Sequence, residues 1–341
     1  MMALYMQQIV SPALKGFFIV RNHFFLFHRS LLFACLGLAV FFAVPLQAQS
    51  ASEEHKPRIA LVMKSLANEF FITMEEGAKA YQKQHSGDFD LLSNGIKNET
   101  DSNAQIRMVE EMIVSKVDAI VIAPSDSKAM VPVLKRAIDH GIIVVNIDNR
   151  LDPGVLNSKR IKIPFVGPDN RKGARLAGDY LAKYLKVGDE VGIVEGVSTT
   201  MNAQQRTVGF KDAMTGAGMK IVSVQSGNWE IGPGNAVSAA ILNEYPQLKA
   251  ILCGNDNMAI GAVSAIRAAG LAGKVYVIGY DDITAIKPML ANGRILATVD
   301  QFADKQAIFG IDTALKAIRE HKPQSALLDM IETPIELITH K

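Results

Sequence analysis

The sequence predicts an α/β protein whose strands form two parallel sheets, and three observations lead to this fold class. Short runs rich in valine and isoleucine recur along the chain, and amphipathic stretches separate them. The runs are nearly continuous in hydrophobic residues rather than alternating, which indicates strands buried on both faces of a parallel sheet. The 341 residues suffice for two domains, and two sheets of about five strands are easier to cover with helices than one sheet of about ten.

The expected elements alternate between strand and helix from residue 59 onward. The expected strands are Ile59–Lys64, Ala119–Ala123, Ile142–Asp148, Val191–Glu195, Ile221–Gln225, Ala250–Cys253, Val275–Gly279 and Ile295–Asp300. The expected helices are Glu69–Gln84, Ser102–Ser115, Ala129–His140, Arg171–Leu185, Ala203–Gly216, Gly234–Glu244 and Ala259–Ala269. Gly141, Gly216 and Gly270 stand where helices should end. Gly167 and Pro168 interrupt the pattern where we expect the first sheet to give way to the second.

The first 48 residues are expected to be an export signal rather than a domain. They contain three basic and no acidic residues, and a 14-residue apolar run, Leu31–Val44, follows Arg29. Such a run is shorter than the roughly 20 residues that a membrane-spanning helix needs. It fits a signal peptide at residues 1–48 that is cleaved near Ala48, which predicts a periplasmic protein. The alternative is an uncleaved membrane anchor, because Phe24–Phe27 could lengthen the apolar span.

Charge and cysteine content exclude several classes of protein. Three of the 36 basic residues belong to the predicted signal, which leaves 33 basic against 34 acidic residues. This balance lacks the basic surplus of a nucleic-acid-binding domain. Two cysteines, Cys35 and Cys253, cannot build a disulfide-rich scaffold or a multi-cysteine metal site, and Cys253 is expected to be a buried thiol.

Sequence patterns typical of catalysis and of cofactor binding are also missing. The chain has no GxSxG, HExxH, Walker or GxGxxG pattern, and its seven histidines lack metal-ligand spacing. We therefore expect no enzyme activity, no catalytic residues, no metal and no cofactor.

Polar and aromatic residues gather after the expected strands, and parallel sheets bind ligands beyond the carboxyl ends of their strands. Carboxylates, amides and guanidinium groups can form paired hydrogen bonds with neighbouring hydroxyls, and aromatic rings can cover the C–H face of a sugar. For each Asp or Asn, the alternative role is a helix cap or a turn. The candidate ligand-binding residues are Lys64, Asn68, Phe70, Phe71, Asp148, Asn149, Arg206, Trp229, Asn255, Asp281 and Gln301.

Several segments along the chain resemble those of a known family. The segments IALVMKSLANEFF, VIAPSDSKAM, VVNIDN, FVGPDNRKGARLAGDYL, GNDNMAIGAVSAIRAAG, VIGYDD and ILATVDQ are similar to the periplasmic monosaccharide-binding proteins of ABC importers. The resemblance is to the ribose-, allose- and inositol-binding group, which shares its fold with the effector domains of lactose-repressor-type regulators. It extends from Arg58 to the C-terminus.

The resemblance implies the type I periplasmic binding fold, in which two doubly wound parallel-sheet lobes are joined by a three-crossing hinge. The crossings are expected near Val166–Pro168, Gln301 and Leu327–Asp329. Residues 57–166 and 302–327 would form the N-terminal lobe, and residues 167–301 and 328–341 would form the C-terminal lobe.

The resemblance also implies roles for the candidate residues. Asp148 and Asp281 would accept hydrogen bonds from sugar hydroxyls, Arg206 would donate to them, and Asn255 and Gln301 would bridge. The aromatic residues would sandwich the sugar ring. The residues carried over from the family's binding positions are Asn68, Phe70, Phe71, Asp148, Arg206, Trp229, Asn255, Asp281 and Gln301.

Three departures from the ribose-binding pattern bear on the ligand. Lys64 stands where ribose binders have a small polar residue, Asn149 replaces an Arg, and Glu69 replaces a common Pro. The first two favour a hexose, a polyol or an inositol over ribose. A sugar acid is a further option, because Lys64 could pair with a carboxylate. Alternatively, Lys64 pairs with Glu69 or another carboxylate of the protein.

The expected function is capture of a monosaccharide or polyol by closure of the lobes, followed by delivery to the membrane permease of an ABC importer. A monomer is expected. One alternative is a receptor that presents its sugar-bound state to a chemoreceptor or sensor kinase. Another is a carbohydrate-active enzyme that uses Asp148 and Asp281 as paired carboxylates. A transcriptional regulator is disfavoured, because an apolar signal stands where a DNA-binding motif would be.

Overall fold

The computed structural model describes residues 55–339 of the chain. The predicted signal peptide, residues 1–48, and its cleavage point near Ala48 lie outside the described residues.

The strands form two six-stranded sheets, in the orders β11-β5-β4-β3-β1-β2 and β12-β10-β9-β8-β6-β7. Neighbouring strands are parallel in both, except that β12 runs antiparallel to β10. This arrangement confirms the predicted fold class. The first sheet contains β1 (Arg58–Ser65), β2 (Asp90–Ile96), β3 (Ala119–Ile122), β4 (Ile143–Ile147), β5 (Phe165–Gly167) and β11 (Met330–Glu332). The second contains β6 (Glu190–Glu195), β7 (Lys220–Ser226), β8 (Ala250–Cys253), β9 (Tyr276–Ile278), β10 (Ala297–Asp300) and β12 (Glu336–Thr339).

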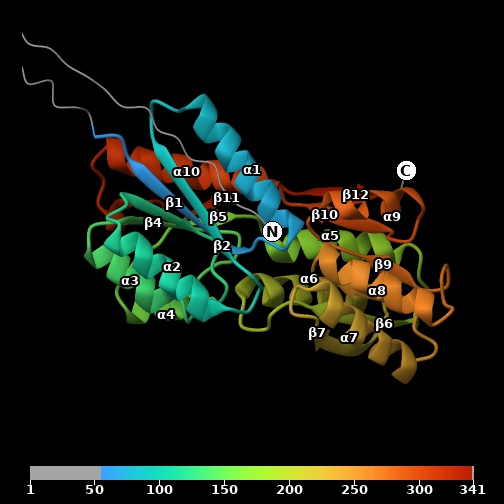
Figure 1. Cartoon of the computed structure of the whole chain (residues 1–341). Coiled ribbons are helices and arrows are strands. Elements are labelled where there is room, and N and C mark those ends of the chain that lie inside the picture. The colour runs from blue at the N-terminus through green and yellow to red at the C-terminus, as the bar shows by residue number, and fades with distance from the viewer. Residues whose placement is uncertain (1–54, 340–341) are drawn as a thin grey trace, which may run out of the picture. The chain divides into compact units, whose positions relative to one another are not determined.

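Helices cover both faces of each sheet (Figure 1). The first lobe, defined by the first sheet, includes α1 (Glu69–Gln84), α2 (Ser102–Val114), α3 (Val131–Asp139), α4 (Pro153–Ser158), α10 (Ala303–Arg319) and the short 3-10 helix η2 (Gln324–Ala326). The second lobe, defined by the second sheet, includes α5 (Asn170–Ala182), α6 (Met201–Gly216), α7 (Ile231–Glu244), α8 (Asp256–Ala268), η1 (Thr284–Ile286) and α9 (Lys287–Ala291).

The central strand β1 shows why its hydrophobic run is continuous. Successive side chains of a strand point to opposite faces. Ile59 and Leu61 belong to a cluster with Met74 of α1 and Ile311 of α10. Ala60 and Val62 belong to a separate cluster with residues of α2 and α3. Both faces are therefore buried, which is why no polar residue alternates with the apolar ones.

Several features of the first lobe differ from the sequence expectation. The edge strand β2, whose sequence is DLLSNGI, was not expected, because its residues are mostly half-exposed and it contains an Asn-Gly pair. The 17-residue helix α10 was not expected either, although it covers β3 and β4. Met330–Glu332 pairs with β5, so the last change of sheet falls between Glu332 and Glu336. This is a correction of the crossing expected near Leu327–Asp329, because the short strand β11 extends the first sheet.

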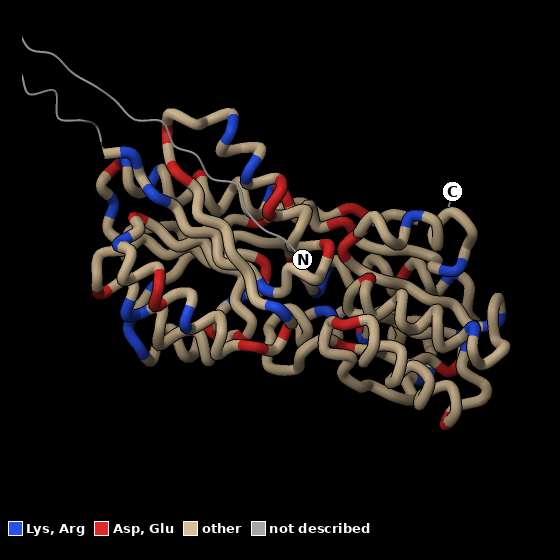
Figure 2. The backbone as a smooth tube through the Cα atoms, in the orientation of Figure 1, with Lys and Arg blue, Asp and Glu red and all other residues tan. Residues whose placement is uncertain are grey.

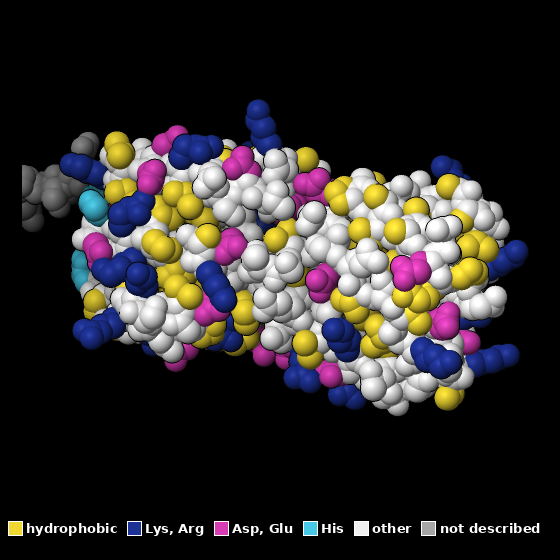
Figure 3. Space-filling view, turned by 90° about the horizontal axis from the view of Figure 1, so that it is seen from below, with side chains coloured by type: hydrophobic (Ala, Val, Ile, Leu, Met, Phe, Trp, Pro, Cys, Tyr) yellow, Lys and Arg dark blue, Asp and Glu magenta, His cyan; other side chains and the backbone are white. Residues whose placement is uncertain are grey.

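The surface carries mixed charges. Acidic and basic residues are spread over both lobes along the backbone (Figure 2), and one face shows them interspersed with hydrophobic side chains (Figure 3). Within residues 55–339, none of the helices has the length and hydropathy needed to cross a membrane.

Candidate functional site

A small polar cavity lies between the two lobes, beyond the carboxyl ends of their parallel strands. Ten of the eleven candidate ligand-binding residues line it, together with Glu99 and Asn202, which were not expected. The lining residues are Lys64, Asn68, Phe70, Phe71, Glu99, Asp148, Asn202, Arg206, Trp229, Asn255, Asp281 and Gln301.

Asn149 is the one candidate that does not line the cavity. Its amide nitrogen donates to the Pro124 carbonyl at 2.9 Å. Its oxygen accepts from the Ser127 hydroxyl and from the backbone N–H of Asn202, each at 3.2 Å. The side chain is fully buried and its hydrogen bonds lie within the protein. The inference that Asn149 selects a hexose or polyol over ribose therefore loses its structural basis.

Two lining asparagines are also helix caps, the alternative role considered for such residues. Asn68 accepts from the backbone N–H of Phe70 at the start of α1, and Asn255 accepts from that of Met258 at the start of α8. Each amide nitrogen has a further partner: Asn68 donates to Glu99 at 2.9 Å, and Asn255 donates to the Trp229 carbonyl at 3.0 Å. Capping thus fixes their orientation at the edge of the cavity.

The backbone is held in an unusual conformation at three lining residues. Asp148, Trp229 and Asp281 have φ angles of 59°, 66° and 119°. Residues other than glycine rarely adopt positive φ, and each such position costs about 1–3 kcal/mol, which the surrounding structure must offset. Strain of this kind tends to occur at functional sites, and here it directs two carboxylates and the tryptophan into the cavity.

The first lobe contributes a lysine between two carboxylates. The Lys64 ammonium lies 3.4 Å from Asp148 Oδ2 and 3.6 Å from Glu99 Oε2, and all three side chains are nearly inaccessible to solvent. Burial raises the pKa of Glu99, and the Lys64 charge and the Asn68 hydrogen bond oppose this rise. The expected pairing of Lys64 with a carboxylate therefore exists, but the partners are Glu99 and Asp148 rather than Glu69.

The second lobe contributes Arg206, which is held on three sides. Its Nε donates to Asn170 at 2.7 Å, and its Nη1 donates to the Gly254 carbonyl at 2.9 Å and to Asp281 Oδ1 at 3.4 Å. The guanidinium carbon lies 3.7 Å from the centre of the Tyr280 ring, which is a cation–π contact. These contacts leave Nη2 free to face the cavity.

Asp281 connects Arg206 to the hinge. Its Oδ1 accepts from Gln301 Nε2 at 2.6 Å, next to the expected second crossing. Burial raises the pKa of Asp281 to about 7; Arg206 opposes the rise and Asp148 adds to it. The carboxyl group is therefore poised between its neutral and ionised forms near neutral pH.

Four buried polar atoms of lining residues have no hydrogen-bond partner among the described residues. They are the acceptors Glu99 Oε2 and Asp148 Oδ2 and the donors Arg206 Nη2 and Trp229 Nε1. Both acceptors lie within 3.6 Å of the Lys64 ammonium, whereas the two donors lack a polar partner among the same residues, which costs about 1–3 kcal/mol for each donor. A hydroxyl group both donates and accepts, so a molecule with several hydroxyls can satisfy both kinds of atom.

Aromatic rings complete the walls of the cavity. Phe70 and Phe71 pack edge to face, with ring centres 5.1 Å apart, at the start of α1. Trp229 lies on the opposite lobe, with the Lys64 ammonium 5.5 Å and the Arg206 guanidinium 5.4 Å from its ring centre. The site therefore combines apolar ring faces with charged hydrogen-bonding groups.

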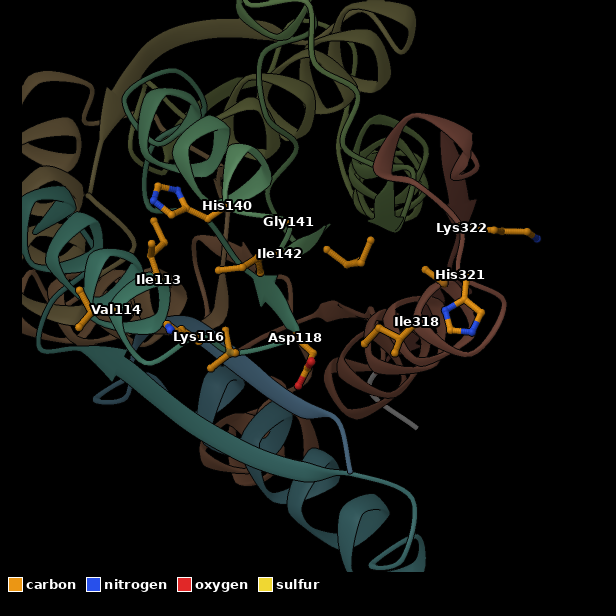
Figure 4. Close-up of a pocket in the computed structure, with 13 residues that line it drawn as sticks. Ile113, Val114, Lys116, Asp118, His140, Gly141, Ile142, Ile318, His321 and Lys322 are labelled. Atoms are coloured by element: carbon orange, nitrogen blue, oxygen red, sulfur yellow. The ribbon is translucent and has the colours of Figure 1, made fainter. Parts of the chain in front are cut away.

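A second, larger hollow lies at the opposite ends of β3 and β4 (Figure 4). It measures about 680 Å3 and is lined by residues such as Ile142, His140, His321 and Lys322. None of the candidate ligand-binding residues lines it. Within residues 55–339, no cluster of histidine, cysteine, aspartate and glutamate residues could hold a metal ion.

Two parallel-sheet lobes around a polar and aromatic cavity define a solute-binding protein of the type I periplasmic binding fold. The profile of the periplasmic binding protein domain family matches residues 59–322, and the chain belongs to this family.

Its relatives include sugar-binding proteins. The chain is 68% identical over 311 residues to the D-ribose/D-allose-binding protein of Pseudomonas aeruginosa, a match that covers 91% of this chain and 98% of that protein. It is 32% identical over 245 residues to the D-allose-binding periplasmic protein of Escherichia coli, covering 71% of this chain and 78% of that protein.

Solved structures show the same architecture. An ABC transporter solute-binding protein from Burkholderia multivorans, with an unknown ligand built as α-D-erythrofuranose, is 73% identical, with a TM-score of 0.82. The match covers 83% of this chain and 99% of that one. A periplasmic solute-binding protein from Actinobacillus succinogenes with bound D-allose is 37% identical, with a TM-score of 0.77, covering 84% and 98% of the two chains.

Proposed function

We propose that the protein is a periplasmic receptor that closes its two lobes over a neutral monosaccharide and delivers it to the permease of an ABC importer. The observation that carries this proposal is the set of buried donors and acceptors around the cavity that make no hydrogen bond within the described residues. Both lobes supply them, so a ligand bonded to all four would hold the lobes together. The family membership and the sugar-binding relatives support the same function.

The charge of the cavity favours an uncharged ligand. Its two cations, Lys64 and Arg206, are already paired with carboxyl groups of the protein. Lys64 already lies between two of the carboxylates. A sugar acid would add a further negative charge to this set, which costs free energy in a buried site. A sugar acid is therefore the least favoured of the ligand classes expected from the sequence.

Within the neutral sugars, we propose D-allose and D-ribose as the ligands. In their pyranose forms the two sugars have the same configuration at C2, C3 and C4, so one set of hydrogen-bond partners can bind both. The relative from Pseudomonas aeruginosa is named for both sugars, and the structure from Actinobacillus succinogenes contains D-allose.

The proposed roles follow from the geometry of each side chain. Asp148, Asp281 and Glu99 accept hydrogen bonds from sugar hydroxyls, and Arg206 donates through Nη2. Trp229 donates through its indole nitrogen and, with Phe70 and Phe71, covers the C–H faces of the ring. Asn68, Asn255 and Gln301 hold these groups in place through the hydrogen bonds described above.

We also propose how the protein is exported, that it acts as a monomer and that it leaves the sugar unchanged. Export depends on the signal at residues 1–48 and its cleavage near Ala48. The receptor acts as a monomer and performs no chemistry on the sugar, although Asp148 and Asp281 face the same cavity. A role in signalling to a chemoreceptor or sensor kinase stays a prediction.

Calorimetry with D-allose, D-ribose, myo-inositol and D-glucuronate tests the proposal. We expect tight one-site binding of allose and ribose, weaker binding of inositol and no binding of glucuronate. Arg206→Ala should weaken allose binding by at least about 30-fold, because it removes a buried charged donor. Lys211→Ala, which changes an exposed residue of the same helix, should bind as the wild type does.

Preferential binding of glucuronate, or normal allose binding by Arg206→Ala, would contradict the assignment. Recovery of chemically altered allose after incubation would overturn the expectation that the protein is not an enzyme.

A further inference from the structure

Among the helices of the second lobe whose N-cap side chains do not bond the first backbone N–H groups are α6 and η1. The first N–H groups of any helix lack partners within the helix and need other acceptors. The N-cap of α6 is Thr200, whose hydroxyl donates to the Val197 carbonyl instead. The N-cap of η1 is Ile283, which has no side-chain acceptor. In both cases the acceptors come from the first lobe.

Glu69 of the first lobe accepts from the start of η1. The N–H of Thr284 donates to Glu69 Oε1 at 2.8 Å, and the N–H of Ala285 donates to Glu69 Oε2 at 3.1 Å. Both carboxylate oxygens are therefore engaged with the second lobe. Glu69 is the first residue of α1 and stands between the cavity residues Asn68 and Phe70, although it does not line the cavity itself.

Ser127 and Asn149 accept from the start of α6. The N–H of Met201 donates to the Ser127 hydroxyl at 2.9 Å, and the N–H of Asn202 donates to Asn149 Oδ1 at 3.2 Å. The single proton of the Ser127 hydroxyl has two acceptors within reach, the Arg150 carbonyl at 2.8 Å and Asn149 Oδ1 at 3.2 Å. This explains the position of Asn149, which faces the other lobe rather than the cavity.

We propose that Glu69 and the Ser127–Asn149 pair are closure residues, which set the balance between open and closed lobes and thereby the affinity for every sugar. Each of these hydrogen bonds joins the two lobes, so it exists only when the lobes are closed. When the lobes separate, water replaces both partners. The net contribution of each bond is therefore modest, although it is larger for the charged acceptor Glu69.

Loss of a contact between the lobes should affect binding differently from loss of a contact with the sugar. A change in the population of the closed state alters the apparent Kd of all ligands by the same factor. Because the bonds form after the sugar has entered, their loss should raise the dissociation rate and leave the association rate unchanged. This inference rests on the proposed function, since it concerns closure over a bound sugar.

Stopped-flow fluorescence of Trp229, the only tryptophan of the chain, measures both rates. We expect Glu69→Ala to release D-allose and D-ribose about tenfold faster, by the same factor for both sugars. Glu69→Gln keeps one acceptor and should show a smaller effect. The matched control is Glu76→Ala, which removes the same charge from an exposed position of α1 and should release both sugars at the wild-type rate.

The second contact offers an independent check, because it joins different parts of the two lobes. Ser127→Ala should also raise the dissociation rate of both sugars equally, and its effect should multiply with that of Glu69→Ala. An unchanged dissociation rate in Glu69→Ala, or an effect on one sugar alone, would overturn the inference. If the wild-type protein binds neither sugar, it is instead the proposed function that fails.

Discussion

Asp281 lies buried between Arg206 and Gln301, and burial raises the pKa of its carboxyl group to about 7. The folded value lies above the ordinary value of 3.8, so the folded protein binds this proton more tightly than the unfolded chain does. The stability that Asp281 contributes through its proton is therefore fully present below about pH 4 and is lost as the pH rises through 7.

Sugar affinity should change with pH in the opposite direction to this stability contribution, because binding favours the form of Asp281 that has lost the proton. A hydroxyl that donates to Asp281 favours the ionised carboxylate, so binding of D-allose should release a proton near pH 7. The affinity should then fall as the pH drops below 7, by at most about tenfold per pH unit. Calorimetry in buffers of different ionisation enthalpy measures the released proton.

Asp281→Asn provides the control for the pH dependence. The amide cannot titrate, so the proton release near pH 7 should disappear in any residual binding by this variant. Binding of allose by the wild type without proton release would show that Asp281 is not the group that meets the sugar hydroxyl.

At the scale of elements, the ends of β6 and β8 place the Trp229 ring. Gly196 follows β6, and a Cβ atom added there would lie 2.0 Å from the indole ring. Gly254 follows the neighbouring strand β8, and a Cβ added there would lie 3.1 Å from the same ring. The ring can therefore lie against the backbone of these two strand ends only because both residues lack side chains.

Gly196→Ala should displace the Trp229 ring and weaken D-allose binding by about tenfold or more, because overpacking of this kind costs about 1–3 kcal/mol. Since Trp229 is the only tryptophan, its emission spectrum should also shift. Gly232→Ala is the control, because a Cβ there would meet nothing within 4 Å. An unchanged emission spectrum and affinity in Gly196→Ala would mean that the ring does not depend on this contact.

The sequence was informative about the central strands and less so about the edges. β1, β3 and β4 are buried on both faces, so their hydrophobic runs are continuous and were predicted. The edge strand β2 is only partly buried and was missed. Because β2 was not predicted, Glu99, which lies in the loop after β2, was not recognised as a candidate site residue. Asn202 was not considered a candidate because the expected helix began at the next residue, Ala203.

Asn149 shows a different limit of sequence reasoning. Its place at the end of a strand marks the correct edge of the sheet, next to Asp148. A position at the end of a strand does not determine which way the side chain points. Asp148 has a φ of 59° and lines the cavity, whereas the Asn149 side chain bonds to Pro124, Ser127 and Asn202. The orientation of each side chain depends on contacts between the lobes, and the residues that make these contacts lie far apart in the sequence.

At the scale of the whole molecule, the order of the chain makes closure possible. The chain passes from one sheet to the other after β5, after β10 and again between β11 and β12, so three backbone segments connect the lobes. The cavity residues are divided between the lobes, with Lys64 and Asp148 on one side and Arg206 and Asp281 on the other. A rotation about these connections would bring the two groups together around a ligand.

A crystal structure of the protein grown with D-allose tests the central claim most directly. We predict one sugar between the lobes, with its hydroxyls bonded to Asp148, Arg206 and Asp281 and its ring between the phenylalanines and Trp229. A sugar bound elsewhere, such as in the hollow at the opposite ends of β3 and β4, would contradict the account. So would a sugar in the cavity that makes no hydrogen bond to these three side chains.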